Sequence, residues 1–132
     1  MAAQRPSTQD YAAQLWRWLD ALGVRHIHLV GHSLGCLIAA RAAAQAPERI
    51  QQLTLLSPAL GYAAAPSAER EAKRKQRLDA LATLGVQGLA VARSSAMLSP
   101  HATVAQQMTV RDLMAQINPT GYTQAVHLLM DS

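Results

Sequence analysis

The 132-residue sequence has little of what disulfide-stabilised, nucleic-acid-binding or membrane proteins need. A single cysteine excludes an internal disulfide and suits a reducing compartment. There is no phenylalanine and only 4% of residues are aromatic, so a base-stacking surface is not expected despite the net charge of +4. No apolar run reaches membrane-spanning length, and the amino terminus lacks the apolar core of a signal peptide. We therefore expect a cytoplasmic protein without nucleic-acid or membrane partners.

The most informative stretch is residues 26–40, where a short apolar run meets Gly-x-Ser-x-Gly and an alanine-rich helical pattern follows. This order predicts a strand, a tight turn with Ser33 at its apex, and a helix. Gly31 and Gly35 flank Ser33 because side chains at those positions are expected to collide in so tight a turn. The free N–H groups at the start of the helix then point toward any oxyanion formed at Ser33.

The pentapeptide Gly31-His32-Ser33-Leu34-Gly35 resembles the nucleophile elbow of the α/β-hydrolase family. The resemblance implies that Ser33 is the nucleophile, that the Leu34 backbone N–H is an oxyanion donor, and that Gly31, His32 and Gly35 shape the elbow. A glycine-flanked serine that only turns the chain is the alternative interpretation.

The flanking residues extend this resemblance over residues 8–60. Residues 19–24 are similar to the end of the family's preceding helix, and residues 46–50 and 53–59 to the loop and strand that follow the nucleophile helix. The expected fold class is α/β: a partial α/β-hydrolase with about two parallel strands, flanking helices and a helical cap, rich in helix. We expect residues 1–60 to be the elbow part of the core and 61–132 a cap segment.

The first helix is predicted over residues 8–22, with a capping box from Ser7 to Asp10. Its apolar face is predicted to contain Tyr11, Leu15, Trp18, Leu19 and Leu22, with Trp16 off that face.

A nucleophile helix is predicted over residues 34–46, with Cys36 as a packed thiol rather than a second nucleophile. A parallel strand is predicted at residues 52–57.

The later chain is predicted to be helical. A charged helix starts near Ser67 and ends at Gly85, and a further segment covers residues 86–97. Ser99-Pro100 and Asn118-Pro119 have the pattern of helix starts and predict helices over about 101–116 and 119–130. The charged face of the helix that starts near Ser67 is interpreted as solvated. A phosphate- or coenzyme-binding patch on this face is the alternative. The methionines at positions 97, 108, 114 and 130 are candidates for an apolar pocket lining or for core packing.

A serine hydrolase also needs a base and an acid. The resemblance implies that both follow the serine, beyond the cap, so we expect a fragment that lacks them. Candidates within the chain are Asp112 with His127, together with His101, Asp131 and His32, and we do not expect them to complete a triad. His26 and His28 share one strand face without a third metal ligand, so neither a metal nor a cofactor is expected.

Three functions remain open from the sequence. The first is a serine hydrolase acting on an ester, lactone or related carbonyl substrate. The second is an acyltransferase or thioesterase, because Gly-His-Ser-Leu-Gly also resembles the nucleophile turn of acyl-carrier transacylases. The third is an inactive, truncated module that only self-associates. In each case unpaired strand edges predict a homo-oligomer, with strands or helices exchanged between copies.

Overall fold

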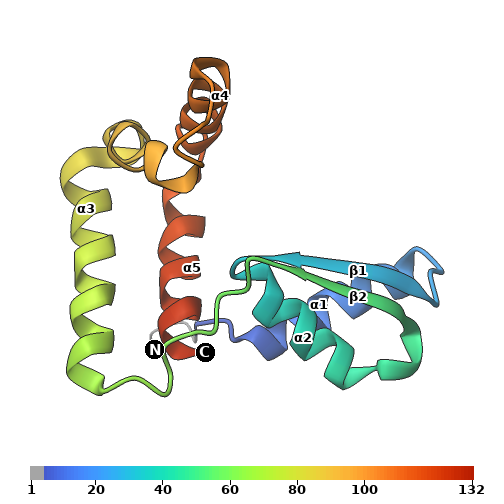
Figure 1. Ribbon diagram of the computed structural model, residues 1–132. Helices are drawn as coiled ribbons and strands as arrows, with labels where there is room; N and C mark the ends of the chain where they lie inside the picture. The colour runs from blue at the N-terminus through green and yellow to red at the C-terminus, as the bar shows by residue number, and fades with distance from the viewer. Residues whose placement is uncertain (1–4) are drawn as a thin grey trace. The chain divides into compact units, whose positions relative to one another are not determined.

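The computed structural model describes residues 5–132, which form two strands and five α-helices (Figure 1). The chain divides into two compact units. The elbow unit runs up to Arg70 and includes His127–Ser132, and the helical unit is Glu71–Val126. The elements are α1 (Thr8–Ala21), β1 (Ile27–His32), α2 (Gly35–Gln45), β2 (Ile50–Leu56), α3 (Ser67–Arg93), α4 (Val104–Met114) and α5 (Pro119–Asp131), with short 3-10 turns at Pro47–Arg49 and Ser95–Met97.

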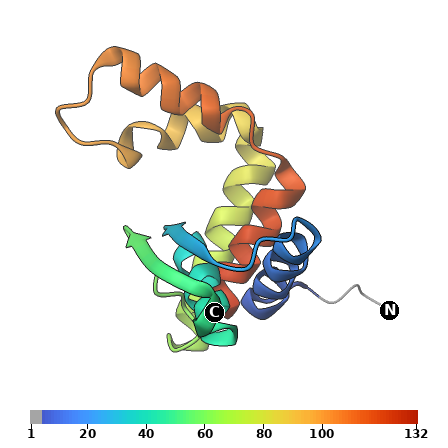
Figure 2. The same cartoon turned by 90° about the vertical axis from the view of Figure 1, so that its right-hand side faces the viewer.

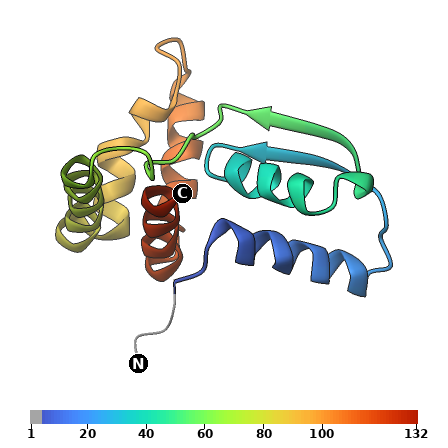
Figure 3. The same cartoon turned by 90° about the horizontal axis from the view of Figure 1, so that it is seen from below.

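The strands of the elbow unit are parallel, as the sequence predicts, and their arrowheads point the same way in Figure 2. Their register places His32 beside Leu56 at the carboxyl ends. Figures 1 and 3 show α1 and α2 on the same face of this strand pair. Val30 on β1 and Leu56 on β2 remain 60% and 49% exposed. The described part of the chain therefore contains a two-stranded sheet with helices on one face.

The core of the elbow unit lies between α1 and α2 and corrects the predicted face of the first helix. The buried cluster is Ala12, Trp16, Leu19 and Ala42, whereas Trp18 is 57% exposed and Leu22 also faces solvent. The reason is the alanine-rich surface of α2, which leaves room for a large ring. The Trp16 indole N–H donates to the Ala42 carbonyl at 3.2 Å, so its polar atom is satisfied inside the core.

The predicted capping box at the start of α1 is confirmed. The Asp10 backbone N–H donates to the Ser7 hydroxyl at 3.3 Å, and the Ser7 backbone N–H donates to the Asp10 carboxylate at 2.8 Å. The Ser7 hydroxyl also donates to this carboxylate at 2.6 Å. These hydrogen bonds favour the charged form and lower the pKa of Asp10 below its ordinary value of 3.8.

Arg49 connects several elements at the far end of the elbow unit. Its guanidinium donates to the carbonyls of Val24 at 2.8 Å and Arg25 at 3.1 Å, just before β1. It also pairs with Asp20 of α1 at 2.7 Å and lies 4.4 Å from the centre of the Trp16 ring. One side chain thereby fixes the end of α1 and the entry to β1 against the start of β2.

The loop after β2 is attached to α5 within the elbow unit. Tyr62 N–H donates to the Leu129 carbonyl at 3.1 Å, and Ala63 N–H donates to the Ser132 carbonyl at 2.7 Å. These donors satisfy carbonyls that a helix end leaves without partners. Gly61 has φ 77° and faces the Ser132 carbonyl so closely that a side chain would collide with it.

Two of the three later helix boundaries agree with the predictions. Gly85 has φ 63° and breaks α3, as expected, into two helical segments. The predicted start of α5 is confirmed, because Gly121 N–H donates to the Asn118 side-chain oxygen at 3.0 Å. The predicted start of α4 at Ser99-Pro100 is wrong: α4 begins at Val104, capped by Thr103.

The start of α4 moves because the sequence contains a better cap. The Thr103 hydroxyl accepts from Gln106 N–H, and the Gln106 side chain accepts from Thr103 N–H at 2.8 Å, a reciprocal box. Within residues 5–132, no helix combines the length and apolar character needed to cross a membrane.

Candidate active site at the elbow turn

Ser33 lies on the turn that joins the carboxyl end of β1 to the start of α2. It is exposed and has φ 51°, in the left-handed region that residues other than glycine seldom adopt. Such strain amounts to about 1–3 kcal/mol and persists only where surrounding contacts hold it. The predicted strand, turn and helix are therefore present, with the serine at the sharpest point of the turn.

The loop after β2 provides the contacts that hold this turn. Ser33 N–H donates to the Leu56 carbonyl at 3.0 Å, and Ala59 N–H donates to the Ser33 carbonyl at 3.2 Å. Cys36 is 2% exposed, and its sulfur lies 3.4 Å from the same Leu56 carbonyl. The thiol is thus packed, as the sequence predicts, and Ser33 is held by the last residue of β2 and by the loop that follows it.

The two glycines of the elbow have different roles. A Cβ on Gly31 would lie 2.8 Å from the Gly35 carbonyl oxygen and 2.9 Å from Ala39 Cβ and from Cys36 Cα, closer than real Cβ atoms approach. A Cβ on Gly35 would meet nothing within 4 Å among the described residues. The expected collision is confirmed at Gly31 and is wrong at Gly35, because Gly35 already lies at the open first position of α2.

The start of α2 also provides a donor at the turn. The hydrogen bonds of the turn use the N–H groups of Ser33, Cys36 and Leu37, and leave that of Leu34 without a backbone acceptor among residues 5–132. Free N–H groups at a helix start carry partial positive charge. An anionic oxygen beside Ser33 would therefore meet a fixed donor at Leu34.

Among the described residues of the elbow unit, no acid or base is hydrogen-bonded to the Ser33 hydroxyl. Within the described residues its hydroxyl has no hydrogen-bond partner, and His32 beside it is exposed. His101 and Asp112 belong to the helical unit, and His127 and Asp131 lie on α5 in the elbow unit, where both have other interactions. The structure thus shows an exposed serine with one free backbone N–H beside it.

The histidines form no metal site in the described residues. His26 precedes β1 and His28 lies on it, both exposed, and residues 5–132 contain no group of three His, Cys, Asp or Glu placed to hold a metal ion.

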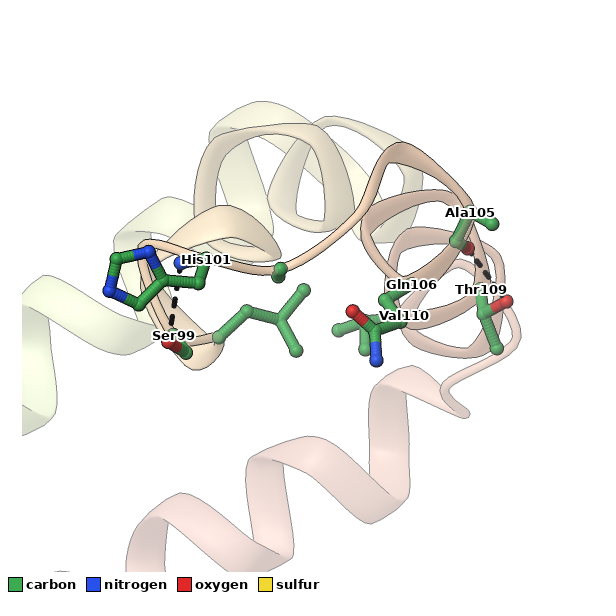
Figure 4. Close-up of a pocket in the computed structure, with 8 residues that line it drawn as sticks. Ser99, His101, Ala105, Gln106, Thr109 and Val110 are labelled. Carbon is green, nitrogen blue, oxygen red and sulfur yellow. Dashed lines mark hydrogen bonds between the residues drawn. The ribbon is translucent and has the colours of Figure 1, made fainter.

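The helical unit contains a separate cavity of about 510 Å³ between the segment before α4 and α4 itself. Figure 4 shows Ser99 and His101 on one side and Gln106, Thr109 and Val110 on α4 opposite them. The candidate methionines do not line this cavity. Met114 and Met130 are buried, in agreement with core packing, and Met97 and Met108 are exposed.

Sequence reasoning missed Ser57, the residue that follows β2. In residues 5–132 it is the second non-glycine residue with positive φ, at 45°. His32 pairs with Leu56 at the carboxyl ends of the strands, and Ser33 and Ser57 are the residues that directly follow them. Two signals could have identified it: its place at the carboxyl end of a parallel strand, and the proline that follows it.

A parallel strand pair with a strained serine between strand and helix is the arrangement expected for the nucleophile elbow of an alpha/beta hydrolase. The model of the alpha/beta hydrolase fold family matches residues 3–126. This chain therefore belongs to the alpha/beta hydrolase fold family. A crystal structure of a hydrolase from Pseudomonas aeruginosa PA01 has the same fold, with a TM-score of 0.77 and 22% sequence identity.

Two curated relatives are similar over shorter segments. N-formylmaleamate deformylase of Pseudomonas putida is 43% identical over 51 residues, which cover 39% of this chain and 19% of that protein. The dihydrolipoyllysine-residue acetyltransferase component of the acetoin cleaving system of Cupriavidus necator is 43% identical over 42 residues, 32% of this chain and 11% of that protein.

The matched part is a minor share of these proteins. The chain matches 98% of its own length but only 48% of the Pseudomonas aeruginosa structure, and less than a fifth of either curated relative. It thus spans about half the length of a solved structure with its fold.

Proposed function

We propose that Ser33 is the nucleophile of a serine hydrolase that acts on an ester, lactone or related carbonyl substrate. The observation that carries the proposal is the elbow itself: an exposed serine with φ 51° beside the unpaired Leu34 N–H. A nucleophile held at this point attacks a carbonyl carbon, and the adjacent donor stabilises the oxygen on which negative charge develops. The absence of a side chain at Gly31 permits the close approach of α2, and His32 and Gly35 are proposed to shape the rest of the elbow.

The acid and the base of this hydrolase are proposed to come from outside residues 5–132 or from a second copy of the chain. The proposal rests on the unpaired Ser33 hydroxyl and on the fold match, which covers 48% of a solved hydrolase structure. One relative is named a deformylase, and this name also fits nucleophilic attack on a carbonyl carbon. The fragment status and the cytoplasmic location expected from the sequence stay predictions.

Labelling with an alkyl fluorophosphonate tests the nucleophile. The labelling is carried out at alkaline pH, where hydroxide can take the Ser33 proton and the proposed outside base is not needed. We expect one adduct per chain by intact mass, located on the Ser33 peptide and absent from Ser33→Ala. An unlabelled chain, or equal labelling of Ser33→Ala, would contradict the proposal.

The pH dependence of labelling identifies the base. If hydroxide is the only base, the rate rises about tenfold per pH unit above neutrality. A histidine makes the rate level off above about pH 7, near the ordinary histidine pKa of about 6.5. Levelling off that grows with protein concentration would assign the histidine to another copy.

Acyl transfer is a second candidate, favoured by the relative named an acetyltransferase component. A transferase passes the acyl group to an added thiol or amine faster than to water. An acyl-Ser33 adduct formed from a thioester should therefore decay faster with such an acceptor if this candidate is right. A decay rate that does not change when the acceptor is added favours the hydrolase proposal.

Self-association is proposed from the sheet. In the described part of the chain β1 and β2 pair only with each other, and Val30 and Leu56 expose apolar surface on them. Bare strand edges and exposed apolar surface favour pairing with a further chain. We expect dimers or larger species in sedimentation at micromolar concentration. A monomer that does not bind a fluorescent hydrophobic dye would contradict this.

A further inference from the structure

Ser57 shares the strained edge of the sheet with Ser33. His32 and Leu56 are the last residues of β1 and β2 and pair with each other, and the two serines follow them directly in the sequence. Backbone hydrogen bonds from Ser33 N–H to the Leu56 carbonyl and from Ala59 N–H to the Ser33 carbonyl enclose Ser57 on both sides. The residues on either side of Ser57 are therefore both hydrogen-bonded to Ser33.

The conformation of Ser57 is unfavourable and needs an explanation. Its φ of 45° is costly for any residue with a Cβ, and the residue before a proline ordinarily adopts an extended conformation. Strain of this kind gathers at functional sites, where the surrounding structure maintains it. In residues 5–132 the two non-glycine residues with positive φ are Ser33 and Ser57.

The Ser57 hydroxyl is available for a ligand. Ser57 is exposed, and no hydrogen bond of its side chain is present within residues 5–132. Ligands of open α/β sheets bind at the carboxyl ends of parallel strands, which is where both serines lie. A hydroxyl donates one hydrogen bond and accepts two, so it suits an ester oxygen or an amide nitrogen.

We propose that the Ser57 hydroxyl contacts the substrate and donates a hydrogen bond to the leaving-group oxygen of an ester attacked by Ser33. This inference rests on the proposed function. As the bond from Ser33 Oγ to the carbonyl carbon forms, the bond from that carbon to the leaving oxygen breaks and its electron pair stays on the oxygen. The Ser33 proton passes to hydroxide or to the enzyme's base. The Ser57 hydrogen bond strengthens as the leaving oxygen gains charge, and so lowers the barrier.

Two acetyl donors that differ in one atom provide the test. Acetylation of Ser33 in the full chain is followed by intact mass, with 4-nitrophenyl acetate and with its thioester analogue. Sulfur is a weak hydrogen-bond acceptor, so the thioester does not use the Ser57 donor. We expect Ser57→Ala to slow acetylation by the oxygen ester about 3- to 10-fold and by the thioester less than about 2-fold.

Ser57→Gly is the matched control. It also lacks the hydroxyl, but it accepts φ 45° without strain and so retains the fold. The same selective loss in both variants supports the proposal. Equal slowing with both donors would mean that Ser57 only shapes the turn, and no slowing would mean that it has no role; either result overturns the inference and leaves Ser33 as the nucleophile. A wild-type chain that neither donor nor the fluorophosphonate labels overturns the proposed function and this inference together.

Discussion

The two units of this chain differ in how their residues are held. In the elbow unit, contacts between distant segments fix single residues: β2 holds Ser33, Arg49 joins α1 to β1, and Trp16 crosses from α1 to α2. In the helical unit, the defined interactions are mostly within one helix or at its cap, as at Thr103. Exposed apolar side chains do not distinguish the units, because both have them: Leu53, Leu55 and Leu60 in the elbow unit, and Leu84, Val91 and Leu113 in the helical unit.

This difference indicates that the elbow unit depends on contacts between distant segments more than the helical unit does. A strained residue such as Ser33 persists only where surrounding contacts hold it, so we expect the elbow unit to tolerate little change in volume. Helices that are set mainly by local capping tolerate much more. Both tryptophans lie on α1, so tryptophan fluorescence reports on the elbow unit alone and separates the two units in an unfolding experiment.

The largest effect is expected at Gly31. Gly31→Ala places a methyl group 2.8–2.9 Å from backbone and Cβ atoms, and should lower the free energy of unfolding by about 3 kcal/mol. Gly35→Ala is the matched control: its methyl group has free space, so a change within about 0.5 kcal/mol is expected. Urea unfolding followed by tryptophan fluorescence measures both. Equal losses would contradict the close contact at Gly31.

The next effect separates the two tryptophans. Trp16→Phe removes the hydrogen bond to Ala42 and leaves a void in the core, for a loss of about 2 kcal/mol. Trp18→Phe, at a position 57% exposed, should change stability by less than about 0.5 kcal/mol. Far-UV circular dichroism during urea unfolding measures both variants without relying on the mutated fluorophore. A larger loss of stability in Trp18→Phe than in Trp16→Phe would support the helix face predicted from the sequence.

Arg49 tests whether carbonyl contacts or the ion pair hold the start of β1. Arg49→Lys keeps the charge near Asp20 but loses the paired contacts to the Val24 and Arg25 carbonyls. We expect it to lower the free energy of unfolding by about 1 kcal/mol. Asp20→Asn removes the ion pair, whose carboxylate is 61% exposed. It should lower the free energy of unfolding by less than about 0.5 kcal/mol. Urea midpoints of the two variants compare them. The reverse order would make the ion pair dominant.

The smallest effect compares one capping box in each unit. Ser7→Ala should reduce stability by about 1 kcal/mol in the fluorescence transition, whereas Thr103→Ala should leave that transition unchanged and lower only the helix content. The boxes also differ in pH dependence. The pKa of Asp10 is lowered in the folded chain, so its contribution is complete above about pH 4 and is lost as pH falls through the folded pKa.

The pKa itself measures this coupling. In Ser7→Ala, a carbon NMR titration of the Asp10 carboxyl should show its pKa rising part of the way toward 3.8, because the variant loses the hydroxyl donor and keeps the backbone N–H donor. Gln106, which takes the place of the acid in the second box, does not titrate. An unchanged Asp10 pKa would contradict the role of Ser7.

The sequence predicts the elbow unit well because its signals are local. Gly31, Ser33 and the flanking runs identify the strand, turn and helix, and Ser7 with Asp10 identifies the start of α1. The burial of Trp16 could not be predicted, since it depends on the distant alanine surface of α2. The start of α4 was misplaced because two capping patterns lie four residues apart and only the reciprocal one forms.

Only part of the candidate site could be predicted from the sequence, because the rest depends on contacts between distant segments. Ser33 and Leu34 follow from a local motif, but Ser57 becomes visible only when the register of β1 and β2 places it beside Ser33. For the proposed acid and base, no local pattern in the sequence identifies candidates beside the motif.

The most direct test of the account is whether the fold makes Ser33 reactive. Fluorophosphonate labelling should be measured on the native chain and on the same chain unfolded in urea, with the modified peptide identified by mass spectrometry. The account predicts an adduct on Ser33 in the native chain that disappears on unfolding and in Ser33→Ala. Labelling of Ser33 at the same rate in both states, or on other serines in the native chain, would contradict it.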